Sequence, residues 1–207
     1  MKKTPIIAVL FSVSILLGCS NPAKDTTATK QGTTDAPKMD SAATMKAYMD
    51  YMTPSDIHKL LATYTGEWDG AITMWMAPGS QPSKSHGISN YKMILGGRYQ
   101  QSEHKGDING MLTEAVNTLG YDNAKKVFTD TWIDNMGTGT LIMEGPYDPA
   151  TKTISLKGKM YDPASGKEAN MRQTLKLIDS NKQYMELFIE ADGKEFKSME
   201  VKYTRKG

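Results

Sequence analysis

From residue 68 to residue 203, apolar and polar residues alternate in short runs that are separated by turn-forming residues. Successive side chains of a strand point to opposite faces of a sheet, so this alternation predicts half-buried strands. The runs are residues 68–76, 88–95, 98–104, 111–119, 127–134, 141–144, 154–160, 171–178, 184–190 and 196–203. The pattern therefore predicts an all-β domain of about ten short antiparallel strands.

An open sheet of this size would leave two unpaired edges, whereas a closed sheet leaves none. We therefore expect an antiparallel up-and-down β-barrel. Barrels of this size can hold one small ligand, and the alternate apolar positions Ile154, Leu156 and Met160 are expected to line the interior. Many of the 15 methionines fall in the predicted strands. Their flexible side chains suit a cavity that adapts to apolar ligands, and core filling is the alternative.

Two helical patterns precede the strands. Met45, Tyr48, Met49 and Met52 recur at helical spacing and predict a short amphipathic helix. We expect these side chains to pack on the domain itself, and a helix that binds a partner is the alternative.

The second helix has a clearer start. Thr53 offers an N-cap hydroxyl, Pro54 stands at the first helical position and Asp56 is an acid three residues after the cap. Residues 57–61 give the helix an apolar face, and Gly66 marks the change to an alternating pattern. The sequence thus predicts a short helix directly before the first strand.

The N-terminus has the features of an export signal. Lys2 and Lys3 precede the apolar run 6–17, which is followed by Gly18 and Cys19. This resembles a bacterial lipoprotein signal, which implies cleavage after residue 18 and lipidation of Cys19. Several acyl chains would then anchor the protein to a membrane. An ordinary signal peptide with an incidental cysteine is the alternative, although Cys19 is the only cysteine of the chain.

These features predict three segments: a signal peptide at 1–18, a lipidated flexible tether with a short helix at 19–52, and the barrel domain at 53–207. Residues 20–43 hold almost no large apolar side chains and cannot offset the entropy of ordering. Ser20 rather than aspartate after Cys19 favours the outer membrane of the cell envelope, facing the periplasm.

The net charge of the chain argues against one class of binding partner. The formal net charge of +2 over 207 residues gives no field that would attract nucleic acid, so we expect no nucleic-acid partner. The predicted partners are the membrane, through Cys19, and a small apolar ligand; the pattern does not determine the oligomeric state.

Several short motifs carry a family resemblance. They are Gly66-Glu67-Trp68 after a short helix, MILGGR at 93–98, LGYDN at 119–123 and TWIDNMGTG at 131–139. The first is similar to the Gly-x-Trp opening of lipocalin-like (calycin) barrels, which implies a helix that closes one barrel end and a tryptophan packed over it. Together, over residues 53–206, they resemble a bacterial domain-of-unknown-function family, the one numbered fifteen seventy-nine. The resemblance implies a fold and an envelope setting but no reaction.

Five residues are candidates for a ligand site: Trp68, Arg98, Trp132, Asp134 and Met160. Arg98 follows two glycines, and an arginine aimed into the barrel could hold a carboxylate. A structural ion pair of Arg98 with Asp130 or Asp134 is the alternative. Trp132 and Asp134 stand near a glycine-rich turn, so we expect any ligand site between that rim and Arg98.

No catalytic constellation is present, so we predict a protein that is not an enzyme. There is no Gly-x-Ser-x-Gly motif. Carboxylates such as Glu103 and Asp130 are expected on the solvated face. The histidines are His58, His86 and His104, and none has a metal-ligand spacing. Haem-binding barrels of the nitrobindin type use a histidine from a late strand, which this chain lacks, so we predict no cofactor and disfavour haem.

Three functional hypotheses follow. The first is an envelope lipoprotein that binds or carries a small apolar ligand in its barrel. The second is a non-catalytic envelope scaffold or stress protein that binds a partner through the barrel rim. The third, a hydrolase or isomerase, would need a cavity acid with a strongly raised pKa beside Arg98 or Trp132.

Overall fold

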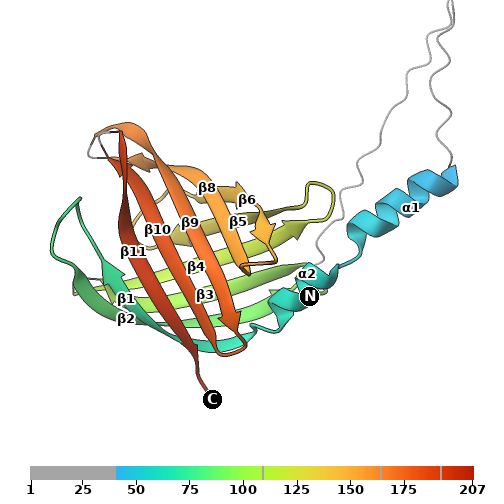
Figure 1. Cartoon of the computed structure of the whole chain (residues 1–207), viewed down its shortest axis with the longest axis horizontal. Helices are drawn as coiled ribbons and strands as arrows, with labels where there is room; N and C mark the ends of the chain where they lie inside the picture. Colours follow the sequence, from blue (N-terminus) through green and yellow to red (C-terminus); the bar gives the residue numbers. More distant parts are fainter. Residues whose placement is uncertain (1–40, 109, 164, 192) are drawn as a thin grey trace, which may run out of the picture. The chain divides into compact units, whose positions relative to one another are not determined.

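The strands pair with their neighbours in chain order and wrap into a barrel (Figure 1). The computed structural model describes residues 41–108, 110–163, 165–191 and 193–207. The strands are β1 (Gly66–Met74), β2 (Ser83–Ile94), β3 (Tyr99–Ile108), β4 (Met111–Asp122), β5 (Val127–Asp134), β6 (Leu141–Gly145), β7 (Tyr147–Asp148), β8 (Thr153–Asp162), β9 (Lys167–Asp179), β10 (Lys182–Ala191) and β11 (Lys194–Arg205). Every pairing is antiparallel. The prediction of a closed antiparallel barrel of about ten strands is confirmed, with β7 as a two-residue addition.

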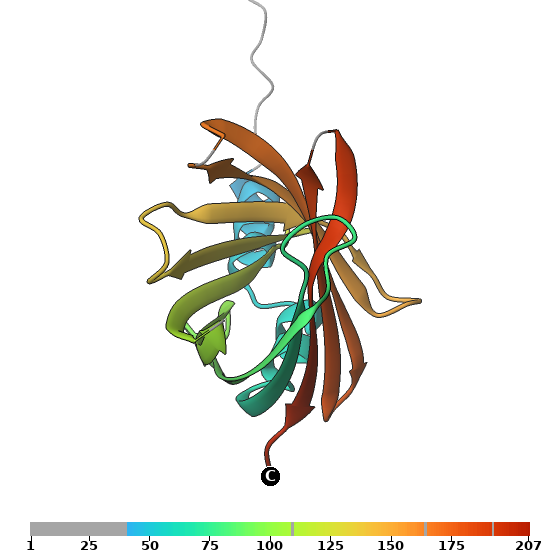
Figure 2. The ribbon, with the colours of Figure 1, turned by 90° about the vertical axis from the view of Figure 1, so that its left-hand side faces the viewer.

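Two pairings close the sheet. The first strand, β1, lies between β2 and the last strand, β11, in the strand order. On the far side, β6 pairs with β8 through only two residue pairs, Met143 with Gly158 and Glu144 with Lys157. Figure 2, turned by 90°, shows the strands enclosing the interior. The barrel therefore has one short seam, between β6 and β8.

Glycine permits this seam. A Cβ added at Gly145 would collide with the backbone carbonyl oxygen of Ser155, and one added at Gly158 would collide with that of Ile142. Because both obstacles are backbone atoms, a side chain at either position would push the strands apart.

The short helix α2 (Asp56–Ala62) stands directly before β1, as predicted. Its N-cap is Ser55, not Thr53, because His58 rather than an acid completes the cap: the backbone N–H of Ser55 donates to Nδ1 of His58 at 3.0 Å. His58 is 5% exposed and meets the ring of Tyr121 edge-on. Burial lowers the pKa of His58, which keeps Nδ1 available as an acceptor.

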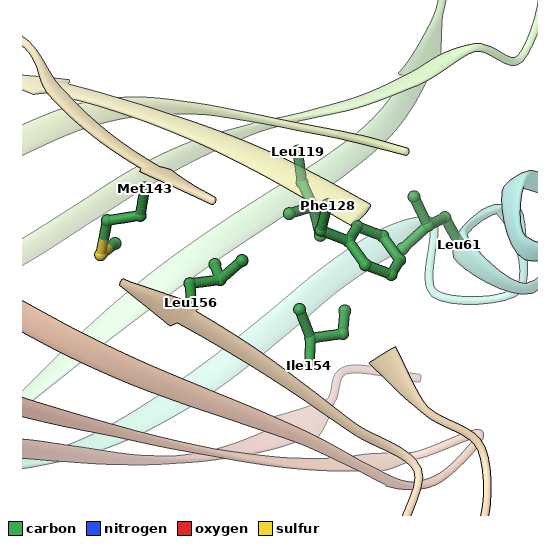
Figure 3. Packing of buried hydrophobic residues seen from close by; sticks show 6 residues of the cluster. All are labelled: Leu61, Leu119, Phe128, Met143, Ile154 and Leu156. Atoms are coloured by element: carbon green, nitrogen blue, oxygen red, sulfur yellow. The ribbon is translucent and has the colours of Figure 1, made fainter. Parts of the chain in front are cut away.

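The main apolar cluster fills the barrel end that α2 covers. Its buried members are Leu61, Leu119, Phe128, Met143, Ile154 and Leu156. In Figure 3, Leu61 of α2 reaches toward Phe128, while Ile154 and Leu156 of β8 face them. Phe128 and Ile154 are fully buried, and burying such a side chain contributes about 1.5–3 kcal/mol. This end of the barrel is a packed core.

Trp68 belongs to a second buried cluster beside the first. Its ring has no exposed surface and stacks between Tyr64 and Tyr91, with centroid distances of 6.0 Å. The guanidinium carbon of Arg205 lies 4.4 Å from the ring centroid. Arg205 also donates to the carbonyl oxygens of Thr63, Thr65 and Ser180. The expected packing of Trp68 near the helix-covered end is confirmed.

The helix α1 (Ser41–Met52) forms at the predicted position but buries none of its residues. Its large apolar side chains, Met45, Tyr48, Met49, Tyr51 and Met52, are 47–62% exposed. The expectation that this face packs on the domain is therefore wrong. Polar contacts at its C-terminal end replace that packing, since Asn123 donates to carbonyl oxygens at residues 50, 51 and 53. No described helix is long and apolar enough to cross a membrane. The predicted signal peptide and Cys19 lie outside the described residues.

Candidate functional site

A cavity of about 60 Å³ lies inside the barrel. Six of its lining residues carry amide, hydroxyl, imidazole or carboxyl groups: Gln100, Ser102, His104, Asn117, Asp130 and Gln173. Three more are the aromatic residues Tyr91, Trp132 and Tyr203. The apolar lining consists of Leu119, Ile154, Leu156, Leu175 and Met185. The interior is therefore amphipathic, not uniformly apolar as the sequence predicted.

Strand register gathers the polar groups on one wall. On neighbouring strands β2 to β5, Tyr91 pairs with Ser102, Ser102 with Asn117, and Asn117 with Trp132. Because directly paired residues point to the same face of a sheet, all four side chains point inward together. The opposite wall is built the same way from β8, β9 and β10, where Ile154, Leu175 and Met185 pair in one row.

Asp130 is the only carboxylate in the lining, and it is 3% exposed. Asn117 donates from Nδ2 to Oδ1 of Asp130 and to the carbonyl oxygen of Thr131. Ser102 donates to Oδ1 of Asn117 at 3.2 Å, which fixes the orientation of that amide. Burial raises the pKa of Asp130 to about 6, and the hydrogen bond from Asn117 opposes this rise. Asp130 thus carries a negative charge at neutral pH in an almost dry setting.

His104 is a second unusual group in the cavity. Its Nδ1 lies 2.8 Å from Oγ of Ser89, and its ring centroid lies 4.9 Å from that of Trp132. Its Nε2 is buried and has no hydrogen-bond partner among the described residues. Burial lowers the pKa of His104 to about 4, so the imidazole is neutral at physiological pH.

Two tyrosines complete the polar wall. Tyr91 and Tyr203 share a hydrogen bond, and their ring centroids are 6.4 Å apart. Burial raises the pKa of both phenols, that of Tyr203 to about 12. Both hydroxyls therefore remain protonated and can donate hydrogen bonds at any physiological pH.

The structure separates the five predicted site residues. Trp132 lines the cavity, whereas Trp68, Arg98, Asp134 and Met160 do not. Trp132 donates from Nε1 to Asp134 at 2.7 Å. The other carboxylate oxygen of Asp134 accepts from the backbone of residues 136 and 137, so Asp134 fixes a turn. Met160 lies two residues beyond Gly158 on the cavity-facing side of β8 and is partly buried.

Arg98 is not aimed into the barrel, and it pairs with neither Asp130 nor Asp134. It is exposed and donates to the carbonyl oxygens of Leu95 and Met52. The cause is local, because residues 95–97 all have positive φ and form the turn between β2 and β3. Arg98 therefore belongs to that turn and supports the end of α1.

The alternation of side chains along β5 could have predicted that Asp130 faces the cavity. It shares the parity of Phe128, a core residue, and of Trp132, so it belongs on the inner face. Its expected place on the solvated face is therefore wrong.

His86 is exposed and lies near Asp69 on the outer wall, so it does not converge with His104. In the part of the chain that the structure describes, no group of three or more His, Cys, Asp or Glu residues could hold a metal ion.

Comparison with known proteins places the chain in a family. A family model matches residues 53–205. The chain belongs to the protein family of unknown function DUF1579. No curated protein matches this DUF1579 chain. The barrel is similar to the crystal structure of Rv2717c from M. tuberculosis, with a TM-score of 0.58 and 15% sequence identity. The match covers 75% of this chain and 100% of Rv2717c, and at that identity it shows a shared fold only.

Proposed function

We propose that this DUF1579 barrel binds a small amphipathic molecule in its interior cavity. The observation that carries the proposal is the uneven lining: the wall on β2 to β5 holds five of the six polar lining residues, whereas the wall on β8 to β10 is apolar except for Gln173. Such a site holds the polar end of a ligand by hydrogen bonds and its apolar body by contact with leucine, isoleucine and methionine. The apolar carrier predicted from the sequence is thereby revised to an amphipathic one.

The volume of the cavity limits the size of the ligand. A single water needs about 10–15 Å³ of such volume, so a cavity of about 60 Å³ has room for about four to six non-hydrogen atoms. Sites for drug-sized ligands usually span about 300–1,000 Å³. The part of the ligand that enters the barrel is therefore small, such as a short chain with one polar group.

Amide NMR titration with 1-butanol and with butyrate tests this proposal. We expect resonances of β3 to β5 and of β8 to β9 to shift together, because the cavity lies between these strands. Ser102→Leu, which fills the cavity from the polar wall, should abolish the shifts. Thr118→Leu introduces the same side chain on the neighbouring strand β4, at a position that faces away from the cavity, and should leave them unchanged. Shifts that are absent, or equal in both variants, would reject a ligand site in the barrel.

The exposed apolar face of α1 favours a second candidate, the envelope scaffold that binds a partner. Met45, Tyr48 and Met49 recur at helical spacing and are 52–62% exposed, so α1 presents an apolar face that the described domain does not cover. A photo-reactive residue at Met49 should cross-link to a defined protein in cells, whereas one at Lys46 on the polar side should not. Absence of a specific product from Met49 would count against this role.

The envelope setting of the protein is also part of the proposal. The Leu-Leu-Gly-Cys sequence at 16–19 supports lipidation of Cys19 and attachment to the outer membrane, facing the periplasm. Metabolic labelling with a radioactive or alkynyl fatty acid should mark the wild-type protein and not Cys19→Ser. Equal labelling of the two proteins, or none, would rule out this anchor.

A further inference from the structure

We infer that the ligand of the barrel cavity is a small protonated amine whose ammonium group pairs with the Asp130 carboxylate. This inference rests on the proposed binding role and names the chemical class that the same cavity selects. It follows from a charge that the protein buries without a counter-ion, and from the chemistry of the groups around that charge.

Asp130 has no cationic side chain beside it in the described lining of the cavity. None of the residues that line the cavity is a lysine or an arginine, and none of the ion pairs among the described residues includes Asp130. Within the described part of the chain, the one hydrogen-bond donor to this carboxylate is Asn117, a neutral amide. Buried carboxylates are usually paired with a cation or a metal ion, because an unpaired buried charge is strongly disfavoured.

No titratable residue in the described cavity lining can become the counter-ion at neutral pH. His104 is held neutral by burial, which lowers its pKa to about 4. The phenols of Tyr91 and Tyr203 are neutral when protonated and negative when they ionise. A positive charge near Asp130 must therefore come from outside the barrel.

The aromatic residues of the lining also favour a cation. Tyr91, Trp132 and Tyr203 all face the cavity that holds Asp130. Aromatic rings attract ammonium groups through their electron-rich faces, and the attraction is stronger where water is excluded. A carboxylate that shares a cavity with three aromatic rings favours a cation over a neutral or an anionic ligand.

An unpaired atom further along the cavity supports a bound polar molecule independently. The buried Nε2 of His104 lacks a partner among the described residues. When Nδ1 donates to Ser89, Nε2 is an acceptor, and a buried acceptor left without a donor is costly. A ligand or an ordered water that donates to Nε2 would satisfy it.

Three probes of equal chain length test the inference. Butylammonium, 1-butanol and butyrate each have five or six non-hydrogen atoms, about the number that the cavity can hold. Binding to the full chain is measured by isothermal titration calorimetry at pH 7.5 in phosphate, because amine buffers would compete. A hydrogen bond to a charged group contributes about 1.5–3 kcal/mol, so we expect butylammonium to bind about 10–100-fold more tightly than 1-butanol, and butyrate to bind weakest.

Two variants test whether the preference for the amine depends on the Asp130 carboxylate. Asp130→Asn keeps the shape and removes the charge, so butylammonium should lose about 10–100-fold in affinity and approach that of 1-butanol. Glu103→Gln neutralises an exposed carboxylate on β3 that pairs with Lys92 outside the cavity, and it should preserve the preference.

The outcomes separate the two proposals. If none of the three probes binds to the wild-type protein, the proposed binding role fails. If 1-butanol or butyrate binds as tightly as butylammonium, or if Asp130→Asn keeps the preference for the amine, the binding role stands and the amine class is wrong.

Discussion

Replacing Asp130 with asparagine should stabilise this protein, and the gain should depend on pH. Asparagine has nearly the same shape and can still accept a hydrogen bond from Asn117, so the main change is the loss of a buried charge. Most substitutions of a buried residue destabilise a protein, so the expected sign of the effect makes this variant informative.

The magnitude follows from the pKa of Asp130. Burial raises this pKa from 3.8 to about 6, and each pKa unit corresponds to about 1.4 kcal/mol. At Asp130 the native state therefore binds more protons than the unfolded chain between pH 4 and pH 6, and the contribution of this residue to stability falls as the pH rises through that window. Above pH 6 the ionised carboxylate destabilises the fold by about 3 kcal/mol relative to its protonated form.

Thermal and urea unfolding of both proteins at pH 4 and at pH 8 measure this effect. We expect the stability of Asp130→Asn relative to the wild type to increase by about 3 kcal/mol between the two pH values, which is about 6–12 °C in Tm. Comparing two pH values removes any constant effect of the new amide on hydrogen bonding. The opposing titration of His104 is present in both proteins and cancels.

Glu103→Gln is the control because its carboxylate is exposed and the pair with Lys92 lowers its pKa. Its effect on stability should be small and of opposite sign, a slight loss at neutral pH that disappears in acid. The reasoning about Asp130 would be refuted if the stability difference between Asp130→Asn and the wild type were the same at pH 4 and pH 8.

Three further predictions concern the framework of the site. Because burial lowers the pKa of His104 from 6.5 to about 4, its titration takes up to about 3 kcal/mol from wild-type stability as the pH drops through this range, against the opposite contribution of Asp130. His104→Gln lacks this loss, so its stability relative to the wild type should rise by up to about 3 kcal/mol in urea titrations from pH 7 to pH 4. Gly145→Ala should destabilise the barrel by about 3 kcal/mol or more, because its Cβ would strike a backbone carbonyl at the seam, whereas Gly139→Ala meets no atom within 4 Å and should change Tm little. Trp68→Ala should cost about 3–5 kcal/mol in chemical unfolding, and a loss under 1 kcal/mol would contradict its place in the core.

The strands were predictable because their signal is local. Alternating side chains and the turns between them are written in runs of a few residues, and each predicted run overlaps an observed strand. The helices were also placed correctly from periodicity and capping residues. The error at the cap of α2 arose because His58, a residue seldom used in this way, completes the hydrogen bonding of Ser55.

Arg98 shows where a local pattern misleads. Its position after Gly96 and Gly97 predicted a kinked strand with an inward arginine, but the positive φ angles of those glycines extend the turn through Arg98. The same two glycines are compatible with both structures. Only the backbone path decides whether the following side chain faces the cavity or the solvent.

By itself, the sequence determined the alternating strands, the closed barrel that removes unpaired edges, and the glycines that allow two strands to meet at the seam. It also places Asp130 on the same face as Phe128 and Trp132. Tertiary structure alone decided that Asn117 would donate to that carboxylate and that apolar side chains of β8 would lie opposite. Those contacts depend on the register between strands and on closure of the barrel between β6 and β8, which no local pattern encodes.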